Sequence, residues 1–429
     1  MSTDGTGSDG MAERTRSSVN PHKTMLTGNA AAAWAARLAD VDYIPAFPIT
    51  PQTEIVETLA TWVAAGEMPA RFVTLDSEHS MLTAAGAAAA TGARVFTATS
   101  SQGLLYGFEL LYTVAGWRVP LVLVNVSRGL ASPITLEPDH NDVLAARDSG
   151  CLQIHAETCQ EVLDSVLIAY RVAEDPRVLL PVIVNLDGFS LSFTREPVEI
   201  PAGADVSAYL GVYAPRHAFI RGERPMAQGV AVLGGPVYSY FKYQMQLAAQ
   251  NALAVHKEAA AAFQAAFGRC YGLVDGYRLE DAELVLVMSN SFATKGRAAV
   301  DRARLEGIKL GLLRLRVLRP FPREAIRGAL AGRRAVAVID QNLSIGFGGI
   351  TIGEIAHALY ADAGRPPLLS YVGGLGGKDI SEHEFRRIVQ DLQVVATTGE
   401  TLPPRLLFTE AEARNMNTLL KIAGKEITG

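Results

Sequence analysis

The sequence contains little cysteine and no surplus of basic residues. Only Cys151, Cys159 and Cys270 occur among its 429 residues, and no two of them form a C-x-x-C pair. An iron–sulfur cluster needs about four thiolates at close spacing, so we expect none on this chain, and a disulfide framework is equally unsupported. The formal net charge is −5 without a long basic run, which argues against a nucleic-acid surface.

Long apolar runs are missing as well. Polar residues interrupt every apolar stretch well before the roughly 20 residues that a transmembrane helix needs, and the N-terminus does not resemble a secretory signal. We therefore expect a cytoplasmic protein that does not contact a membrane. Hydrophobic residues still make up 49% of the chain and charged residues 19%, which is ample material for buried cores.

Short apolar segments alternate with helical patterns along most of the chain. This alternation predicts an α/β fold with parallel sheets. A polar, Gly/Ser-rich start and a Pro/Gly-punctuated stretch near the middle divide the chain. We expect a disordered tail over 1–20, a first domain over 21–200, a linker and connecting helix over 201–255, a smaller α/β domain over 256–400 and a C-terminal tail over 401–429.

Four polar stretches of the first domain fall where a strand ends and a helix begins. In open α/β sheets this edge is where ligands bind. The stretches are "PITPQT" (48–53), "DSEHS" (76–80), "TATSSQGLL" (97–105) and "SRGLASPITLEPDHNDVLAARDSG" (127–150).

The first of these stretches predicts a capped helix start. Pro51 suits the first helical position because its φ is fixed and its missing N–H would be unpaired there. Thr50 would then be the N-cap, with its hydroxyl accepting from the first turn. The turn is either a cap alone or an anion site built on the same geometry.

Glu78 and the segment Ser101–Gly103 offer a second candidate site. Glu78 begins a helix rich in Ala and Gly, where it either complements the helix dipole or serves as a desolvated, proton-handling acid. Ser101, Gln102 and Gly103 are small or polar residues at a strand end. They either start an ordinary helix or let a flat ligand approach the backbone.

Arg128 follows the buried strand "LVLVNVS". Its guanidinium either binds a carboxylate of a ligand or pairs with the acidic residues Glu137, Asp139 or Asp142. The cluster "DHND" (139–142) resembles a metal site in composition only, so we expect His140 to be a hydrogen-bonded loop residue and predict no metal site. The glycine turns "GFGG" and "GGLGG" of the second domain do not match a phosphate-binding motif.

Taken in order, the motifs resemble one known family. The segments are "FPITPQTEIVETLA", "DSEHSMLTAAGAAAATGARVFTATSSQGL", "SRGLASPI…DHNDVLAARDSG", "QIHAETCQEVLD", "SYFKYQMQLAAQNAL", "GLLRLRVLRPFP", "DQNLSIGFGG" and "VGGLGGKDI". Together they are similar to the α subunit of the 2-oxoacid:ferredoxin oxidoreductases, of the pyruvate synthase (pyruvate:ferredoxin oxidoreductase) type. The resemblance covers about 25–395.

The resemblance implies a thiamine-diphosphate pyrimidine-binding domain followed by a domain like the C-terminal domain of transketolases. It implies that thiamine diphosphate is shared with a β subunit that carries the diphosphate site, Mg²⁺ and an iron–sulfur cluster. No G-D-G…N motif for that half occurs here. Further implied partners are γ and ferredoxin-like δ subunits and, where NAD is the acceptor, a flavin/NAD subunit. Coenzyme A is the implied acyl acceptor.

The resemblance also assigns roles to individual residues. Glu78 matches the glutamate that contacts N1′ of the aminopyrimidine, and Ser101, Gln102 and Gly103 lie in the matching cofactor segment. Thr50 and Arg128 match residues that bind the substrate carboxylate. The implied reaction is oxidative decarboxylation of a 2-oxo acid, with pyruvate favoured, to acyl-CoA and CO₂. Electrons pass through iron–sulfur centres to ferredoxin.

The substrate and the class of enzyme stay open at this point. Pyruvate enzymes usually read N-R-A-L-S-A-P-I-N-I where this chain has "SRGLASPITL". The departures at Ser127, Gly129 and Thr135 lie in the loop that carries Arg128, and their relaxed spacing leaves a larger 2-oxo acid open as the substrate. Phenylglyoxylate or a branched-chain acid with NAD as final acceptor is one alternative, whereas Thr50 argues against oxalate. The chain could also be a lipoamide-type dehydrogenase subunit, a transketolase-like subunit or a non-catalytic scaffold.

Overall fold

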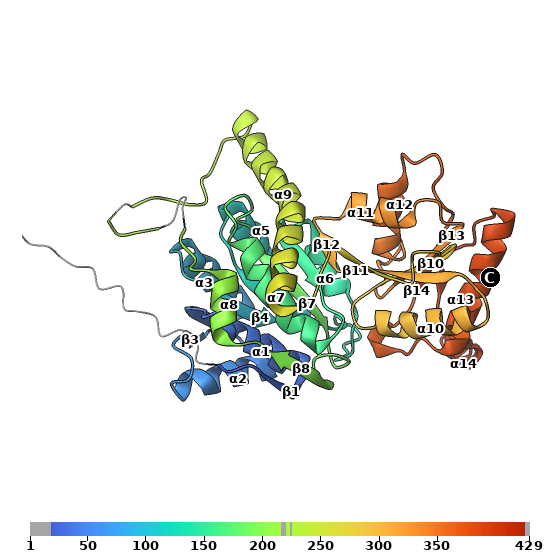
Figure 1. Ribbon diagram of the computed structural model, residues 1–429, viewed down its shortest axis with the longest axis horizontal. Helices are drawn as coiled ribbons and strands as arrows, with labels where there is room; N and C mark the ends of the chain where they lie inside the picture. Colours follow the sequence, from blue (N-terminus) through green and yellow to red (C-terminus); the bar gives the residue numbers. More distant parts are fainter. Residues whose placement is uncertain (1–18, 216–219, 224, 425–429) are drawn as a thin grey trace, which may run out of the picture.

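A computed structural model describes residues 19–215, 220–223 and 225–424, and within them two α/β domains lie side by side (Figure 1). The expected tail over 1–20 falls outside the described residues except for its last two, as does the end of the chain from 425 onward.

A parallel sheet forms the centre of the first domain. Its hydrogen-bonded order is β12-β6-β7-β5-β4, and β2-β3 continues it through a parallel bridge between Tyr43 and Val95. The strands β2 to β7 are all parallel, and only β12 runs antiparallel. The bounds are β2 (Tyr43–Ala46), β3 (Arg71–Thr74), β4 (Phe96–Thr99), β5 (Val122–Ser127), β6 (Leu152–His155), β7 (Val182–Asp187) and β12 (Val317–Arg319).

Helices cover both faces of this sheet because its strands are apolar on both sides. Val122, Val124 and Val126 of β5 pack into one core with α1 (Gly28–Leu38) and α7 (Cys159–Ala173). Leu123 faces the other way, toward α3 (Glu78–Ala90), α4 (Gln102–Tyr106), α5 (Phe108–Trp117) and α6 (Asn141–Ala145), which the short 3₁₀ turn η1 (Ala146–Asp148) follows. α2 (Thr53–Ala64) packs on α1, and β1 (His22–Thr27) pairs antiparallel with β8 (Arg195–Ile200).

The expected boundaries between 200 and 256 do not match the packing. α8 (Gly203–Leu210) places Val206 and Tyr209 in the core of the first domain. α9 (Pro236–Phe267) runs across residue 255 without a break and packs on α7 through Ala259 and Phe263. The connecting helix therefore belongs to the first domain over its whole packed length.

The second domain holds a six-stranded sheet of order β15-β14-β13-β10-β11-β9, in which only β9 is antiparallel. Its strands are β9 (Val274–Tyr277), β10 (Leu284–Ser289), β11 (Leu310–Leu315), β13 (Ala335–Asp340), β14 (Leu368–Val372) and β15 (Arg405–Leu406). α10 (Ala293–Leu305) and α13 (Glu382–Thr398) cover one face, while α11 (Arg323–Leu330) and α12 (Ile350–Leu359) cover the other. Because β15 joins the sheet and Leu407 packs into the core, this domain extends past the expected boundary at 400.

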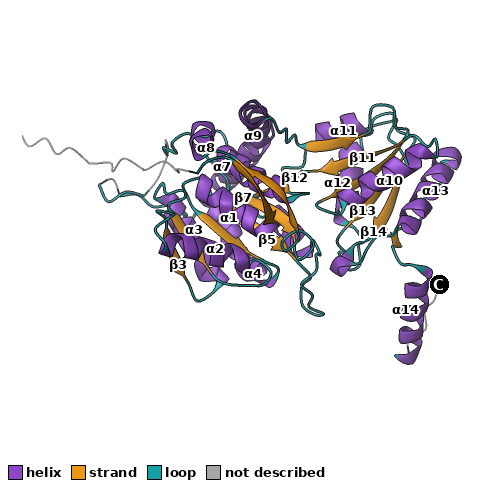
Figure 2. Cartoon of the chain, turned by 60° about the horizontal axis from the view of Figure 1, so that its bottom comes forward, coloured by secondary structure: helices purple, strands orange, loops and turns teal. Residues whose placement is uncertain are grey.

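The last described element after β15 is α14 (Glu410–Ile422), which projects away from the second sheet (Figure 2). Its N-terminus carries a complete capping box formed by Thr409 and Glu412. Among the helices of the described residues, none is long and apolar enough to cross a membrane.

The two domains share both a strand and a core. β12 comes from the second half of the chain but pairs with β6 of the first sheet. One apolar cluster runs from Leu82 and Leu123 of the first domain to Leu313 and Val338 of the second. The domains are therefore fixed to one another by packing as well as by the chain.

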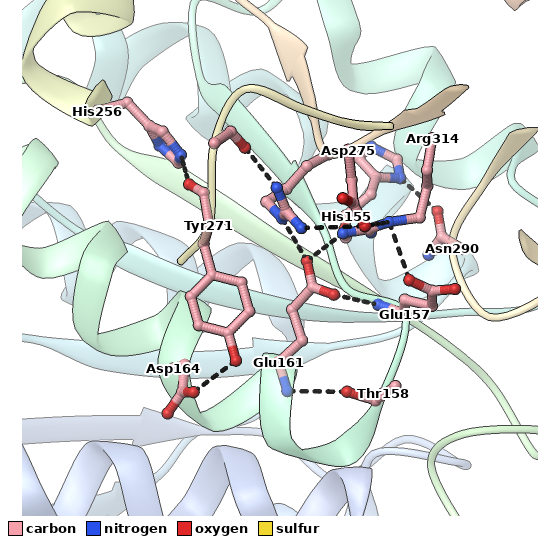
Figure 3. Close-up of polar contacts among 12 residues, drawn as sticks. His155, Glu157, Thr158, Glu161, Asp164, His256, Tyr271, Asp275, Asn290 and Arg314 are labelled. Carbon is pink, nitrogen blue, oxygen red and sulfur yellow. Dashed lines mark hydrogen bonds and ion pairs between the residues drawn. The ribbon is translucent and has the colours of Figure 1, made fainter. Parts of the chain in front are cut away.

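A buried ionic network reinforces this junction (Figure 3). The fully buried Arg314 of β11 contacts Glu161 at 2.7 Å and Glu157 at 3.1 Å, and Arg316 also contacts Glu161, at 2.6 Å. Burial would raise the pKa of the Glu161 carboxyl, but the two arginines outweigh it and lower that pKa to about 2. Glu161 is therefore an ionised group inside the protein, paired across the domain junction.

Candidate active site

Four loops that follow parallel strands meet at the carboxyl edge of the first sheet. They come after β2, β3, β4 and β5 and lead to Thr50, to Glu78 at the start of α3, to Gly103 in the first turn of α4 and to Arg128, in that order. Gly103 lies against Glu78, and the Arg128 Nε donates to the Thr50 carbonyl at 2.7 Å. The predicted residues thus come together in two contacting pairs at the sheet edge where α/β proteins bind ligands.

The predicted N-cap at Thr50 is wrong. α2 begins at Thr53, its N-cap is Gln52 and no side chain caps it, while Thr50 is exposed two residues earlier. The reason is that the loop closes on itself before the helix starts. The Gln52 N–H donates to the Ile49 carbonyl at 3.0 Å, and the buried Gln52 side chain donates to the Phe47 carbonyl at 2.9 Å. Thr50 therefore contacts Arg128 through its backbone carbonyl.

Glu78 is buried but unpaired. It is the first residue of α3, only 5% of it is exposed, and the helix is capped by the Ser77 side chain instead. Within the described chain the Glu78 carboxylate has no hydrogen bond or ion pair. A buried carboxylate without a partner is costly, so the structure of Glu78 favours an external group that shares a proton with it.

The backbone at Gly103 approaches Glu78 closely. A Cβ at this position would lie 2.5 Å from both the Glu78 Oε1 and the Thr99 Oγ1, so only glycine fits. Around it, Thr99 Oγ1, Ser100 Oγ and Gln102 Oε1 are buried without a hydrogen-bond partner in the described residues. Several unsatisfied polar atoms beside the unpaired Glu78 carboxylate suit the polar edge of a bound ring.

Ser101 has a different environment from Gln102 and Gly103. Its amide donates to the Asp142 Oδ2 at 3.0 Å and its hydroxyl donates to the Gly129 carbonyl at 3.1 Å. The amide and the hydroxyl of Ser101 therefore both donate to groups inside the chain. Its φ of 47° lies in the left-handed region, which a side chain other than glycine adopts at a cost.

Arg128 is positioned by carbonyl groups and not by acids. Its Nη1 donates to the Gly129 carbonyl at 3.3 Å, in addition to the bond from Nε to Thr50. Burial lowers the pKa of the Arg128 guanidinium, and the charge of Asp142 opposes that shift. No carboxylate of the described residues forms an ion pair with Arg128, so the alternative that Arg128 pairs with the acidic loop is not what the structure contains.

His140 is a hydrogen-bonded loop residue, as the sequence predicts. Its Nε2 lies 2.7 Å from the Asp187 Oδ1, and the other oxygen of Asp187 accepts from the Ser291 amide of the second domain at 3.0 Å. Burial disfavours the charged imidazole, but Asp187 outweighs it and the pKa of His140 is raised. In the part of the chain that the structure describes, no group of three potential ligands could hold a metal ion.

Sequence reasoning missed Asp142 as the centre of the site's hydrogen bonds. Its carboxylate is fully buried and accepts from the Ser101 amide, the Asn125 side chain and the Ser127 hydroxyl. A usable signal was present in the strands. "VNVS" and "VNLD" place polar residues two apart at the ends of β5 and β7, and the register pairs Asn125 with Asn185 and Ser127 with Asp187. Polar residues facing each other at buried strand ends need an internal partner.

A glycine turn of the second domain supports the loop that carries Arg128. A Cβ on Gly377, which ends the short turn η2 (Leu375–Gly377), would lie 2.4 Å from the Glu137 Oε2. Gly129 lies equally close to the Thr135 methyl group, with a Cβ position 2.5 Å away. The "GGLGG" turn is therefore a close-packing element beside the site.

Comparisons with known proteins identify the family. The sequence model for the thiamine diphosphate-binding part of pyruvate flavodoxin/ferredoxin oxidoreductase matches residues 34–261, and the model for core domain II of pyruvate:ferredoxin oxidoreductase matches 282–385. Pyruvate synthase subunit PorA of Methanocaldococcus jannaschii is 43% identical over 86% of this chain and 94% of its own length. PorA of Thermotoga maritima is 41% identical over 86% and 94%, and ketoisovalerate oxidoreductase subunit VorA of Pyrococcus horikoshii 39% over 89% and 96%.

Solved structures agree at the level of the fold. A 2-oxoglutarate:ferredoxin oxidoreductase from Magnetococcus marinus superposes with a TM-score of 0.66 at 20% identity, covering 86% of this chain and 65% of that chain. A split-gene transketolase superposes with a TM-score of 0.53 at 13% identity over 88% of this chain. The expected fold class, a thiamine diphosphate-binding α/β domain followed by a smaller α/β domain, is confirmed. The chain belongs to the pyruvate:ferredoxin oxidoreductase family and corresponds to its α subunit.

Proposed function

We propose that this chain is the α subunit of an enzyme that oxidatively decarboxylates pyruvate to acetyl-CoA and CO₂ and passes the electrons to ferredoxin. The relatives named pyruvate synthase match at 40–43% identity, whereas those named ketoisovalerate oxidoreductase match at 38–39%. A branched-chain 2-oxo acid is therefore the second candidate substrate. The observation that carries the proposal is the presence, at one sheet edge, of a buried acid without a partner, Glu78, and an arginine without an ion pair, Arg128.

Thiamine diphosphate fits the environment of Glu78. The aminopyrimidine ring needs a carboxyl group at N1′ and polar partners along its edge, which Glu78 offers together with the unsatisfied Thr99, Ser100 and Gln102. When bound, the cofactor supplies the nucleophile for the 2-oxo carbon and the electron sink for decarboxylation. Glu78 holds and returns a proton at N1′, and its burial excludes water from that exchange.

Arg128 binds the carboxylate of the 2-oxo acid. The Arg128 Nε and Nη1 donate to carbonyl groups, and the Nη2 group is left to donate to the carboxylate of a ligand. Such charge-assisted pairs are strong where water is excluded. Thr50 orients the guanidinium through its carbonyl, and its exposed side chain lies on the same loop. The substrate is thereby oriented with its carboxylate held at Arg128.

The remaining parts of the reaction are assigned to partner subunits. The described residues contain three free cysteines, two of them buried, which cannot ligate a cluster of the usual four-thiolate type. We assign the diphosphate, Mg²⁺ and an iron–sulfur cluster to a β subunit, and electron transfer to γ and ferredoxin-like δ subunits. Coenzyme A accepts the acyl group, and the cytoplasm is the proposed compartment.

The decisive experiment is anaerobic purification of the native complex, followed by dye reduction with pyruvate, 2-oxoisovalerate and phenylglyoxylate. Iron and thiamine are measured in the same sample. We expect CoA-dependent reduction that is fastest with pyruvate. A preference for 2-oxoisovalerate would replace pyruvate with the second candidate, and acyl transfer to lipoamide without iron would refute the ferredoxin proposal.

A further inference from the structure

We propose that Ser101 and Asp142 are positioning residues that couple the cofactor-binding turn at Gln102–Gly103 to the substrate-binding Arg128. The inference rests on the proposed roles of Glu78 and Arg128. It adds a physical connection between them.

The connection starts at Asp142. Its Oδ2 accepts from the Ser101 amide at 3.0 Å and from the Asn125 Nδ2 at 3.1 Å, and its Oδ1 accepts from the Ser127 hydroxyl and from the Val143 amide. The residue is fully buried. A carboxylate that accepts four donors fixes the end of β4 against the end of β5, because each donor comes from a different backbone position.

Ser101 completes the connection from the cofactor side. Its hydroxyl reaches across to the Gly129 carbonyl at 3.1 Å, and Gly129 is the residue after Arg128. The same carbonyl accepts from the Arg128 Nη1 at 3.3 Å. Ser101 and Arg128 therefore bind one oxygen atom, so a shift of either side chain moves the acceptor of the other.

Ser101 is also linked directly to the residues proposed to bind the cofactor. Gln102 and Gly103 are the next two residues of the chain after Ser101. Gly103 lies so close to Glu78 that a Cβ on Gly103 would be 2.5 Å from the Glu78 Oε1. The left-handed φ of 47° at Ser101 sets the direction in which this turn leaves β4. The strained conformation persists because the hydrogen bonds of Asp142 and Gly129 hold both sides of the residue.

Asp142 also places a negative charge behind the substrate arginine. The Asp142 charge favours the protonated guanidinium of Arg128, although no ion pair forms between them. The carboxylate therefore supports the charge of Arg128 while leaving its donors to the ligand. Positioning to within about 0.5 Å is what such supporting groups contribute to a reaction site.

The test compares Ser101→Ala and Asp142→Asn in the complete complex with a matched control, Asp164→Asn. Asp164 is also a fully buried carboxylate, bound by Arg269 at 2.6 Å and by the Tyr271 hydroxyl at 2.6 Å, but it lies on α7 beside the domain junction (Figure 3). Four quantities are measured for each variant: the Kd for thiamine diphosphate by calorimetry, KM and kcat for the 2-oxo acid, and the melting temperature.

We expect Ser101→Ala to raise both the cofactor Kd and the KM by about 5- to 10-fold, the value of one buried hydrogen bond. The melting temperature should fall no further than in Asp164→Asn, which leaves Kd and KM unchanged. Asp142→Asn keeps an oxygen that accepts from the Ser101 amide, whereas a further variant, Asp142→Ala, does not. Both should raise the cofactor Kd and the KM, and Asp142→Asn should raise them less. If Ser101→Ala lowers only the melting temperature, the positioning role is wrong.

A second background shows whether Ser101 acts through Arg128. In an Arg128→Ala complex, Ser101→Ala should no longer change KM but should still raise the cofactor Kd. An undiminished effect on KM would overturn the coupling. If the wild-type complex oxidises no 2-oxo acid, the proposed function fails, whereas the calorimetric Kd still tests the connection between Ser101 and the cofactor turn.

Discussion

Replacing Arg128 separates a substrate-binding arginine from a structural one. In Arg128→Ala, the substrate carboxylate loses a charge-assisted pair in a site that excludes water, worth about 2–4 kcal/mol. This corresponds to a rise in KM of about 30- to 1000-fold. Arg128→Lys should recover little, because an ammonium group cannot replace two parallel donors of the planar guanidinium.

The structure predicts only a small loss of stability in the same variant. Arg128 donates to the carbonyls of Thr50 and Gly129 and pairs with no acid of the described residues. Two such bonds are worth roughly 1 kcal/mol each, and removing a desolvated charge offsets part of that loss. The melting temperature should therefore fall by at most about 2–4 °C.

Arg118 provides the matched control. It is a partly buried arginine that donates to the carbonyls of Val178 and Leu179 without an ion pair within the described residues, and burial lowers its pKa as it does for Arg128. It ends α5, away from the four loops. Steady-state kinetics and thermal melting are measured on Arg128→Ala and Arg118→Ala together. Equal KM values with a lower melting temperature for Arg128→Ala would refute carboxylate binding.

Three further predictions follow from the site and the junction. Glu78→Gln should leave the complex assembled but lower kcat by roughly 10²–10⁴-fold, and near-normal turnover would remove Glu78 from the mechanism. The chain purified alone should bind thiamine diphosphate only weakly and show no iron absorbance, since it contributes the pyrimidine side; stoichiometric iron would contradict this. Because the pKa of Glu161 is about 2 when folded and near 4.3 in an unfolded chain, its pairing stabilises the fold fully above about pH 4.3. That stability, about 3 kcal/mol, is lost as the pH falls toward 2. In Glu161→Gln, the free energy of unfolding should no longer fall between about pH 4.3 and pH 2. If its dependence on pH equals that of the wild type, Arg314 and Arg316 do not stabilise the charge of Glu161.

The fold was predictable because its signals are local and repeated. Strands such as β5 and β7 are short and mostly apolar, and β2, β3 and β4 are each followed by a helix, which indicates a parallel sheet covered on both faces. The boundaries were less predictable. α9 contains an apolar stripe that fits either domain, and only the packing of Ala259 and Phe263 on α7 assigns it to the first.

The site was predictable where chemistry and strand position coincide, as for Glu78 and Arg128. The error at Thr50 arose because a Pro-Ile-Thr-Pro sequence specifies a cap only if the helix begins directly after it. The buried Gln52 side chain closes the turn instead, through a bond to the Phe47 carbonyl that no local pattern encodes. The hydrogen-bonding role of Asp142 was missed for a similar reason, since its donors Ser101, just after β4, and Asn125, on β5, lie more than ten residues away in the chain.

The second domain takes part in the site through the loop that follows β5. Gly377 packs against Glu137, and Ser291 bonds to Asp187, which in turn holds His140. Glu137 and His140 lie near the far end of the stretch that begins at Arg128, so that end of the loop depends on contacts from the second half of the chain. The shared strand β12 and the ionised Glu161–Arg314 pair keep those contacts in register. The first domain alone would carry Arg128 on a loop without the contacts of Gly377 to Glu137 and of Ser291 to Asp187.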